Sequence, residues 1–129
     1  MNTKIIVHLK KYFTGLQAVY LFGSVAKGMA TTKSDVDIAF LCTNKVSNLT
    51  RWKVAEDLAR LLNRDVDLVD LSRATEVMRM EVVSSAQRIY VKDEDVVEAF
   101  EDKVYMLYID LNENRAAILA DIASRGSVY

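Results

Sequence analysis

Apolar and polar positions follow two different periods along the chain, and each period predicts a different kind of element. Where apolar side chains recur every three to four positions, the spacing is typical of a helix with one buried face. This spacing predicts a first helix over about residues 3–14, ended by Gly15. The other helices predicted in this way cover about residues 48–62, a stretch that ends near Ala86, and a long C-terminal stretch that begins at about Asp93.

Polar residues that can cap these helices stand just before them. Ser47 or Asn48 can accept a hydrogen bond from the first backbone N–H groups of the second helix, and Ser72 or Thr75 can do so for the third. Trp52 opens the apolar face of the second helix, so we expect it to pack in the core rather than to serve as a stacking surface.

Short apolar runs between the helices predict strands. These runs are rich in β-branched and aromatic side chains and are bounded by glycine or polar residues. The four predicted strands cover residues 17–22, 35–41, 65–71 and 88–91, and residues 24–29 can form one or two helical turns after the first strand. Helices and strands alternate without an internal repeat or a low-complexity linker, which predicts a single compact α/β domain over residues 1–129.

The composition sets limits on function. Hydrophobic residues make up 51% of the 129 residues, which is enough for one sizeable core, and the formal net charge is −1. A dedicated DNA- or RNA-binding protein usually carries a strong basic excess, so we expect no direct nucleic-acid binding. Residues 1–33 nevertheless carry five lysines and no acid, and this basic region could bind a small polyanion such as a nucleotide.

Cysteine use and the length of the apolar runs indicate the compartment. Cys42 is the only cysteine, so no internal disulfide can form, which is typical of a reducing compartment. The N-terminus lacks the pattern of a signal peptide, and no apolar run approaches the roughly 20 residues that a membrane span needs. We therefore expect a cytoplasmic protein without a membrane partner.

Two aspartates stand at the start of the second predicted strand, where charge is unusual. Asp35 and Asp37 lie two positions apart, so their side chains point to the same face, and Asp65 and Asp67 repeat the pattern in the third strand. At about 5 Å and an effective dielectric constant near 20, each pair of like charges costs roughly 3 kcal/mol. A fold keeps such a cluster only if water screens it or cations neutralise it, as two divalent ions do at phosphoryl-transfer sites.

A glycine and a serine end the first predicted strand. Gly23 allows a tight turn, and Ser24 then offers a hydroxyl and backbone N–H groups at the start of a helix, where phosphate binds well. Taken separately, Gly-Ser is more often a turn with a helix cap, and Asp-x-Asp is more often solvated charge at a strand end. Found together, they supply anion donors and cation ligands in one segment, a combination that is far rarer by chance.

The segment GSVAKGMATTKSDVDIAFL resembles the signature of the polymerase β-like nucleotidyltransferases, in which Gly-Ser is followed after ten residues by Asp-x-Asp. The chain is similar to the minimal members of that superfamily, and among them to MntA-type antitoxins, which are encoded beside HEPN-family toxins such as HepT. The resemblance covers about residues 3–91 and implies a small α/β (α+β) core, with a mixed sheet flanked by helices. The long C-terminal helix, at about residues 93–125, is then an extension of this core.

The resemblance also implies roles for individual residues. Asp35 and Asp37, with a third carboxylate at Asp67, would bind two Mg²⁺ ions. Asp65 is the rival for the third position, because period-two spacing puts it on the same strand face. The Gly23-Ser24 turn would hold the β- and γ-phosphates of a nucleoside triphosphate.

One position departs from the family pattern. Many relatives carry arginine directly after Gly-Ser, whereas this chain has Val25. Lys27 could supply that positive charge from the next turn. Ser34, just before the paired aspartates, joins the candidate nucleotide-binding residues.

The activity that the resemblance implies is Mg²⁺-dependent transfer of AMP from ATP to a hydroxyl, namely a tyrosine of a HepT-type toxin ribonuclease that AMPylation silences. Two alternatives stay open on the sequence. One is an antitoxin that neutralises its toxin by binding alone, and the other is a nucleotidyltransferase for a small molecule such as an aminoglycoside. Intact Asp35, Asp37 and Asp67 favour an enzyme, because binding alone needs none of them.

The start of the C-terminal helix is strongly acidic. Residues 93–113 carry eight acids against one lysine, while apolar side chains recur at helical spacing along the same stretch. An acidic helix face could steer the approach of a partner with a basic surface. We expect the other face to pack on the core and four acids to project into solvent: Glu98, Glu101, Asp102 and Glu113.

Overall fold

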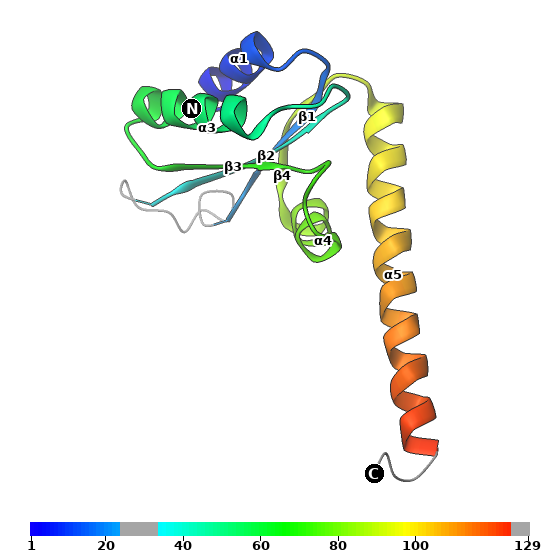
Figure 1. The fold of residues 1–129 in the computed structure, drawn as a ribbon. Helices are drawn as coiled ribbons and strands as arrows, with labels where there is room; N and C mark the ends of the chain where they lie inside the picture. Colours follow the sequence, from blue (N-terminus) through cyan, green and yellow to red (C-terminus); the bar gives the residue numbers. More distant parts are fainter. Residues whose placement is uncertain (24–33, 125–129) are drawn as a thin grey trace.

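A four-stranded sheet lies between two pairs of helices in the computed structural model of the chain (Figure 1). The structure describes residues 1–23 and 34–124, without the side chains of 116–119 and 121–124. The elements of the described part are, in chain order, α1 (Asn2–Tyr12), β1 (Leu16–Phe22), β2 (Val36–Cys42), α3 (Asn48–Leu62), β3 (Val66–Asp70), α4 (Glu76–Ser85), β4 (Gln87–Val91) and α5 (Glu94–Ser124).

The strands are ordered β3-β2-β1-β4, and the sheet is mixed. β1 pairs antiparallel with both β2 and β4, whereas β2 and β3 run parallel. A parallel pair needs a crossover connection, and α3 provides it over one face of the sheet. A mixed sheet flanked by helices and followed by a long C-terminal helix confirms the predicted fold class.

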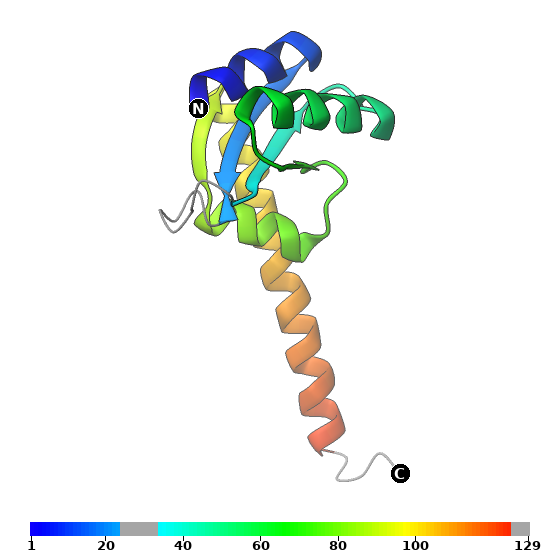
Figure 2. The ribbon, with the colours of Figure 1, turned by 90° about the vertical axis from the view of Figure 1, so that its left-hand side faces the viewer.

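Each face of the sheet packs against its own helices, as Figures 1 and 2 show from two directions. On one face, α1 and α3 cover a core that includes Ile5, Phe40 and Leu58. On the other face, α4 and the first turns of α5 cover a smaller core that includes Tyr20 and Val97. Alternate residues of a strand therefore meet different helices, and this decides which side of the sheet a functional side chain reaches.

The helix starts confirm one residue of each predicted pair of caps. Ser47 caps α3, and its hydroxyl oxygen accepts a hydrogen bond from the backbone N–H of Thr50 at 3.1 Å. Thr75 caps α4, and its hydroxyl oxygen accepts one from the N–H of Met78 at 3.2 Å. The helical turns predicted for residues 24–29 lie outside the described residues.

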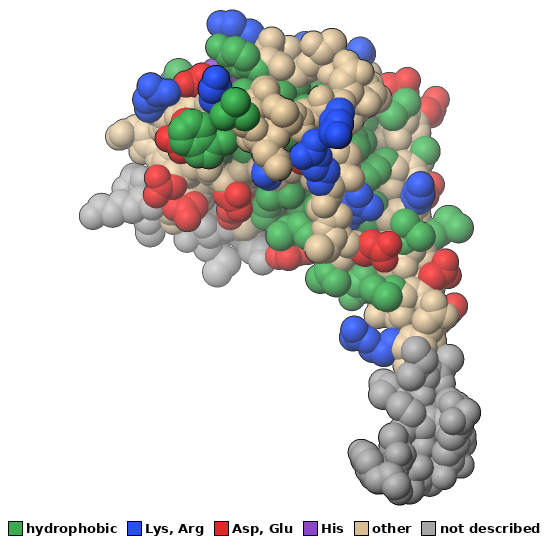
Figure 3. Space-filling view, viewed as in Figure 1, with side chains coloured by type: hydrophobic (Ala, Val, Ile, Leu, Met, Phe, Trp, Pro, Cys, Tyr) green, Lys and Arg blue, Asp and Glu red, His purple; other side chains and the backbone are tan. Residues whose placement is uncertain are grey.

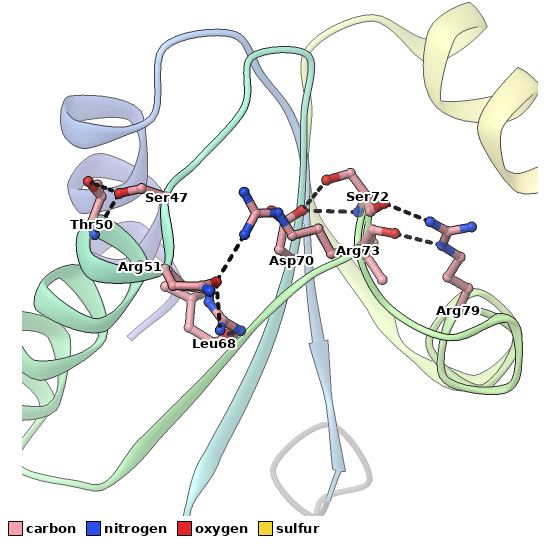
Figure 4. A network of polar contacts seen from close by, with 10 residues as sticks. Ser47, Thr50, Arg51, Leu68, Asp70, Ser72, Arg73 and Arg79 are labelled. Atoms are coloured by element: carbon pink, nitrogen blue, oxygen red, sulfur yellow. Dashed lines mark hydrogen bonds and ion pairs between the residues drawn. The ribbon is translucent and has the colours of Figure 1, made fainter.

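Ser72, the other candidate cap of α4, belongs instead to the turn that leaves β3 (Figure 4). The buried carboxylate of Asp70 accepts hydrogen bonds from the backbone N–H of Ser72 at 3.0 Å and from its hydroxyl at 2.7 Å. From α4, Arg79 donates to the carbonyl oxygens of Leu71 and Ser72 at 2.7 and 2.8 Å. These contacts fix the position of α4 relative to the end of β3.

The prediction that Trp52 packs in the core is wrong. The indole is 61% exposed, and the buried side chains of α3 are Val54 and Leu58. These two residues lie about one helical turn apart on one face. Trp52 stands two positions before Val54 and so points to nearly the opposite side of the helix.

The long helix α5 packs on the sheet with its first turns only. Val97 and Val104 are buried, Phe100 is partly buried against the same core, and Leu111 is 41% exposed. In Figure 1 the helix continues past α4 and away from the sheet. None of the helices in the described part of the chain combines the length and apolar character that crossing a membrane requires.

Glu101 does not project into solvent, contrary to the prediction from the acidic start of α5. Its buried carboxylate accepts two hydrogen bonds from the guanidinium of Arg88 on β4, at 3.1 and 2.5 Å. Arg88 also donates to Glu94 at 2.7 Å. The pattern within α5 carries no sign that β4 places an arginine opposite this position. The other three acids of that group are exposed as predicted: Glu98, Asp102 and Glu113.

Glu101→Ala should lower the free energy of unfolding by about 2–3 kcal/mol, because it removes the bidentate partner of Arg88. The loss is smaller than for a fully buried pair, since the Arg88 side chain is 37% exposed. Urea unfolding followed by circular dichroism measures the change. Glu98→Ala, on the exposed side of α5, is the matched control and should change stability by less than about 0.5 kcal/mol. Equal losses in the two variants would contradict this role for the ion pair.

Candidate active site

Strand pairing brings two of the predicted carboxylates together. In the parallel register of β2 and β3, Asp37 is the direct partner of Asp67. Register partners point to the same face, and neighbouring strands lie about 4.8 Å apart, so these two side chains stand side by side. Asp65 lies just before β3, and its backbone carbonyl accepts a hydrogen bond from the N–H of Val36 at 2.8 Å.

Both carboxylates face the side of the sheet that carries α4. Ile38, the residue after Asp37, is buried in the core beneath α1 and α3, and so is Leu68, the residue after Asp67. Alternation along each strand therefore turns both aspartates to the opposite face. Asp35, one residue before β2, is exposed.

Negative charge crowds around Asp37. Burial raises the pKa of its carboxyl, and the carboxylates of Asp67 and Asp35, followed by Glu81, raise it further. The ionised form is therefore disfavoured in the folded chain, and a bound cation would relieve the repulsion. Figure 3 shows acidic side chains gathered at this end of the molecule.

Glu81 is a candidate site residue that the sequence pattern did not reveal. It lies on the exposed side of α4, and no spacing distinguishes it from other glutamates on helix surfaces. Only the path of the chain shows that α4 covers the face on which Asp37 stands.

Gly23 leaves room for the Asp37 side chain. It follows Phe22, which is the register partner of Asp37 on β1. Its φ is +71°, in the left-handed region that favours glycine, and a Cβ there would lie 2.1 Å from Oδ2 of Asp37. The glycine of the predicted phosphate turn therefore borders a predicted metal ligand directly.

The other predicted nucleotide-binding residues can be placed only in part. Ser24 and Lys27 lie outside the described residues. Ser34 is half-buried and comes directly before Asp35, at the entrance to β2. The roles of these three residues stay predictions.

The chemistry of the donor set fits magnesium. The carboxylate oxygens of Asp35, Asp37 and Asp67 are hard ligands of the kind that Mg²⁺ prefers, and a divalent ion would neutralise their excess charge. Among the described residues, no three acidic, histidine or cysteine side chains are already gathered closely enough to hold a metal ion.

Comparison with known proteins connects most of the chain to a family. Residues 3–95 match the family model described as "Polymerase beta, Nucleotidyltransferase". The protein adenylyltransferase MntA of Shewanella oneidensis is 39% identical over 121 residues, which make up 94% of this chain and 86% of that protein.

Solved structures extend the similarity to the whole fold. A crystal structure of a toxin–antitoxin with AMP-PNP matches with a TM-score of 0.84 and 38% identity, over 95% of this chain and 98% of that chain. A second match is to a chain in the structure of a tri-AMPylated Shewanella oneidensis HEPN toxin in complex with MNT antitoxin. The TM-score is 0.77 and the identity is 36%, over 95% of both chains. Coverage of this extent includes most of α5, so the long helix is part of the shared architecture.

Proposed function

The chain belongs to the polymerase β nucleotidyltransferase family, and on that basis we propose that it transfers AMP from ATP to a hydroxyl group of a partner protein. The observation that carries the proposal is the register of β2 and β3, which sets Asp37 beside Asp67 and next to Gly23. A turn suited to phosphate and carboxylates suited to divalent cations thus meet at one end of the sheet. Nucleotidyl transfer needs both, because it positions a triphosphate and neutralises charge on its leaving group.

We propose a HEPN-family toxin as the partner, with a tyrosine as the acceptor, so that the chain acts as the antitoxin of the pair. The support comes from relatives, of which one is named a protein adenylyltransferase and another was solved with a tri-AMPylated HEPN toxin. A further relative was solved with AMP-PNP, which supports ATP as the donor. A cytoplasmic location fits Cys42, which is buried as a free thiol.

The proposed reaction exchanges one phosphorus–oxygen bond for another. The acceptor oxygen bonds to the α-phosphorus, the bond from that phosphorus to the oxygen bridging to the β-phosphate breaks, and pyrophosphate leaves. Gly23 lets the backbone approach the phosphates, and Asp67 takes up the proton that leaves the acceptor hydroxyl. When bound, two Mg²⁺ ions held by Asp35, Asp37 and Asp67 would neutralise charge on the phosphates.

A transfer assay tests the proposal. The purified chain, mixed with a HEPN toxin from the same genome, Mg²⁺ and ATP labelled at the α-phosphate, should transfer label to the toxin. Asp67→Asn should slow the transfer by about a hundredfold or more, because Asp67 is the register partner of Asp37. Asp65→Asn should stay within about threefold of the wild-type rate, since Asp65 precedes β3.

ATP labelled at the γ-phosphate is the control, because this phosphate leaves with pyrophosphate and should not label the toxin. Label from the γ-phosphate would show phosphorylation and overturn the proposal. Suppression of the toxin without any transfer would support neutralisation by binding alone. Loss of transfer only in Asp65→Asn would move the third carboxylate to that residue.

A further inference from the structure

One face of α5 carries a regular stripe that the proposed chemistry does not use. Glu98, Asp102, Tyr105 and Ile109 follow one another at steps of four, three and four residues, so they share one side of the helix. We refer to these four residues as the α5 seam. Steps that alternate between three and four are typical of the line along which one helix packs against another.

The α5 seam is open to solvent and changes character along its length. Its first two residues are exposed carboxylates. Tyr105 is 36% exposed, Ile109 is 53% exposed, and Met106 next to them is 65% exposed. Figure 3 shows acidic and hydrophobic side chains close to one another on the surface of this helix. An exposed apolar stretch of this kind on a helix marks an interaction site, because a partner that covers it removes it from water.

The acidic end of the seam borders a groove of about 370 Å³ between α4 and α5. Three carboxylates and one guanidinium line it. The guanidinium, that of Arg88, is already paired with Glu94 and Glu101. Among the ion pairs of the described residues, none includes Glu98 or Asp102. The groove therefore keeps a negative charge that a lysine or arginine of another protein would complement.

The α5 seam and the carboxylate pair of the candidate active site belong to the same side of the molecule. Asp37 and Asp67 stand on the face of the sheet that α4 covers, and α5 packs on that face through Val97. Figures 1 and 2 show α5 running past α4 and continuing beyond it. A protein held along the seam would lie beside α4, on the side to which the carboxylates point.

We propose that the α5 seam docks a helix of the protein whose hydroxyl accepts AMP, an inference that rests on the proposed function. That helix presents a lysine or arginine to Glu98 and Asp102 and apolar side chains to Tyr105 and Ile109. The spacing of the seam fits a helical partner, and its charge fits a basic one. Docking there holds the acceptor close to the carboxylates and so raises its effective concentration at the site.

Two substitutions on the seam test the inference, each with a control on another side of α5. Asp102→Lys reverses the charge beside the groove, and Ile109→Asp puts a charge in the apolar half. Asp110→Lys and Leu111→Asp make the same chemical changes at exposed positions that point away from the seam. Calorimetry with the purified HEPN toxin should show about 30-fold weaker binding for each seam variant and less than about threefold for each control.

Binding of AMP-PNP, measured on the same variants, keeps this inference separate from the proposed function and should not change. Seam variants that bind the toxin as tightly as the wild type overturn the docking role, even if AMP transfer stands. Controls that lose as much affinity as the seam variants overturn it too. If the wild type forms dimers that Ile109→Asp dissociates, while toxin affinity is unchanged, the seam is a contact between two copies of this chain. A wild-type chain that neither binds nor labels the toxin overturns both proposals.

Discussion

Asp37→Asn should reduce AMP transfer by about a hundredfold or more and, in metal-free buffer, should stabilise the fold. The substitution keeps the shape of the side chain but removes the charge that would hold a divalent cation. Stability should rise because burial and the charges of Asp67 and Asp35 disfavour the ionised form, as the raised pKa of Asp37 indicates. The gain should be present at neutral pH and should vanish at acid pH, below the range in which a free aspartate titrates.

The transfer assay with α-labelled ATP measures the first effect, and melting temperatures in EDTA at neutral and acid pH measure the second. Asp110→Asn, at an exposed position on α5, is the control and should change neither quantity. Mg²⁺ added with AMP-PNP should raise the melting temperature of the wild type more than that of Asp37→Asn. If the Asp37→Asn variant keeps its transfer rate, Asp37 is not a metal ligand. If its melting temperature at neutral pH is lower than that of the wild type, the neighbouring carboxylates do not destabilise ionised Asp37.

Gly23→Ala should reduce AMP transfer by about tenfold to a hundredfold and cost about 1–2 kcal/mol of stability. The backbone at this position has a φ of +71°, which disfavours alanine. The new methyl group would also lie 2.1 Å from Oδ2 of Asp37, so the carboxylate must leave its place beside Asp67. The transfer assay and urea unfolding measure the two effects on the same protein preparation.

Gly15→Ala is the control, because alanine at this position meets a backbone strain and a steric clash similar to those at Gly23. Gly15 has a φ of +83°, and a Cβ there would lie 2.4 Å from Oγ1 of Thr43, but it stands at the other end of β1. This variant should lose a similar amount of stability and keep its transfer rate per folded molecule. If both variants lost activity only in proportion to their loss of stability, the effect of Gly23→Ala would be one of folding and not of site geometry.

Features that depend on local geometry could be predicted from the sequence. The alternation along residues 36–38 places Asp37 on the face opposite Val36 and Ile38 wherever the strand lies, because side chains of a strand alternate with a period of two. Asp35 precedes β2, so the shared face of Asp35 and Asp37 stays a prediction. The caps at Ser47 and Thr75 are local in the same sense, since each hydroxyl reaches only the first turn of its own helix.

Features that depend on packing between distant segments could not be predicted in this way. Period-two spacing predicts one strand face for Asp65 and Asp67, whereas β3 begins only at Val66, and the register with β2 shows that Asp67 stands beside Asp37. Glu81 approaches the site because α4 crosses that face of the sheet, and Glu101 is buried because Arg88 lies opposite it on β4. In each case the deciding neighbour is remote in sequence, and period or composition carries no information about it.

The parallel pairing of β2 and β3 also has a consequence for the cooperativity of the enzyme. Asp37 and Asp67 are carried by the strands themselves, and β2 is an interior strand with neighbours on both sides. A loop can open in a local fluctuation, whereas amides of an interior strand exchange with solvent only when much of the domain unfolds. Asp67, however, lies on β3, which stands at the edge of the sheet and pairs with β2 on one side only. Fraying of this edge can therefore change the spacing of the two carboxylates while β2 stays folded. On heating, amides of β3 should therefore exchange with solvent before those of β2, and the spacing of the pair should be lost no later than the fold.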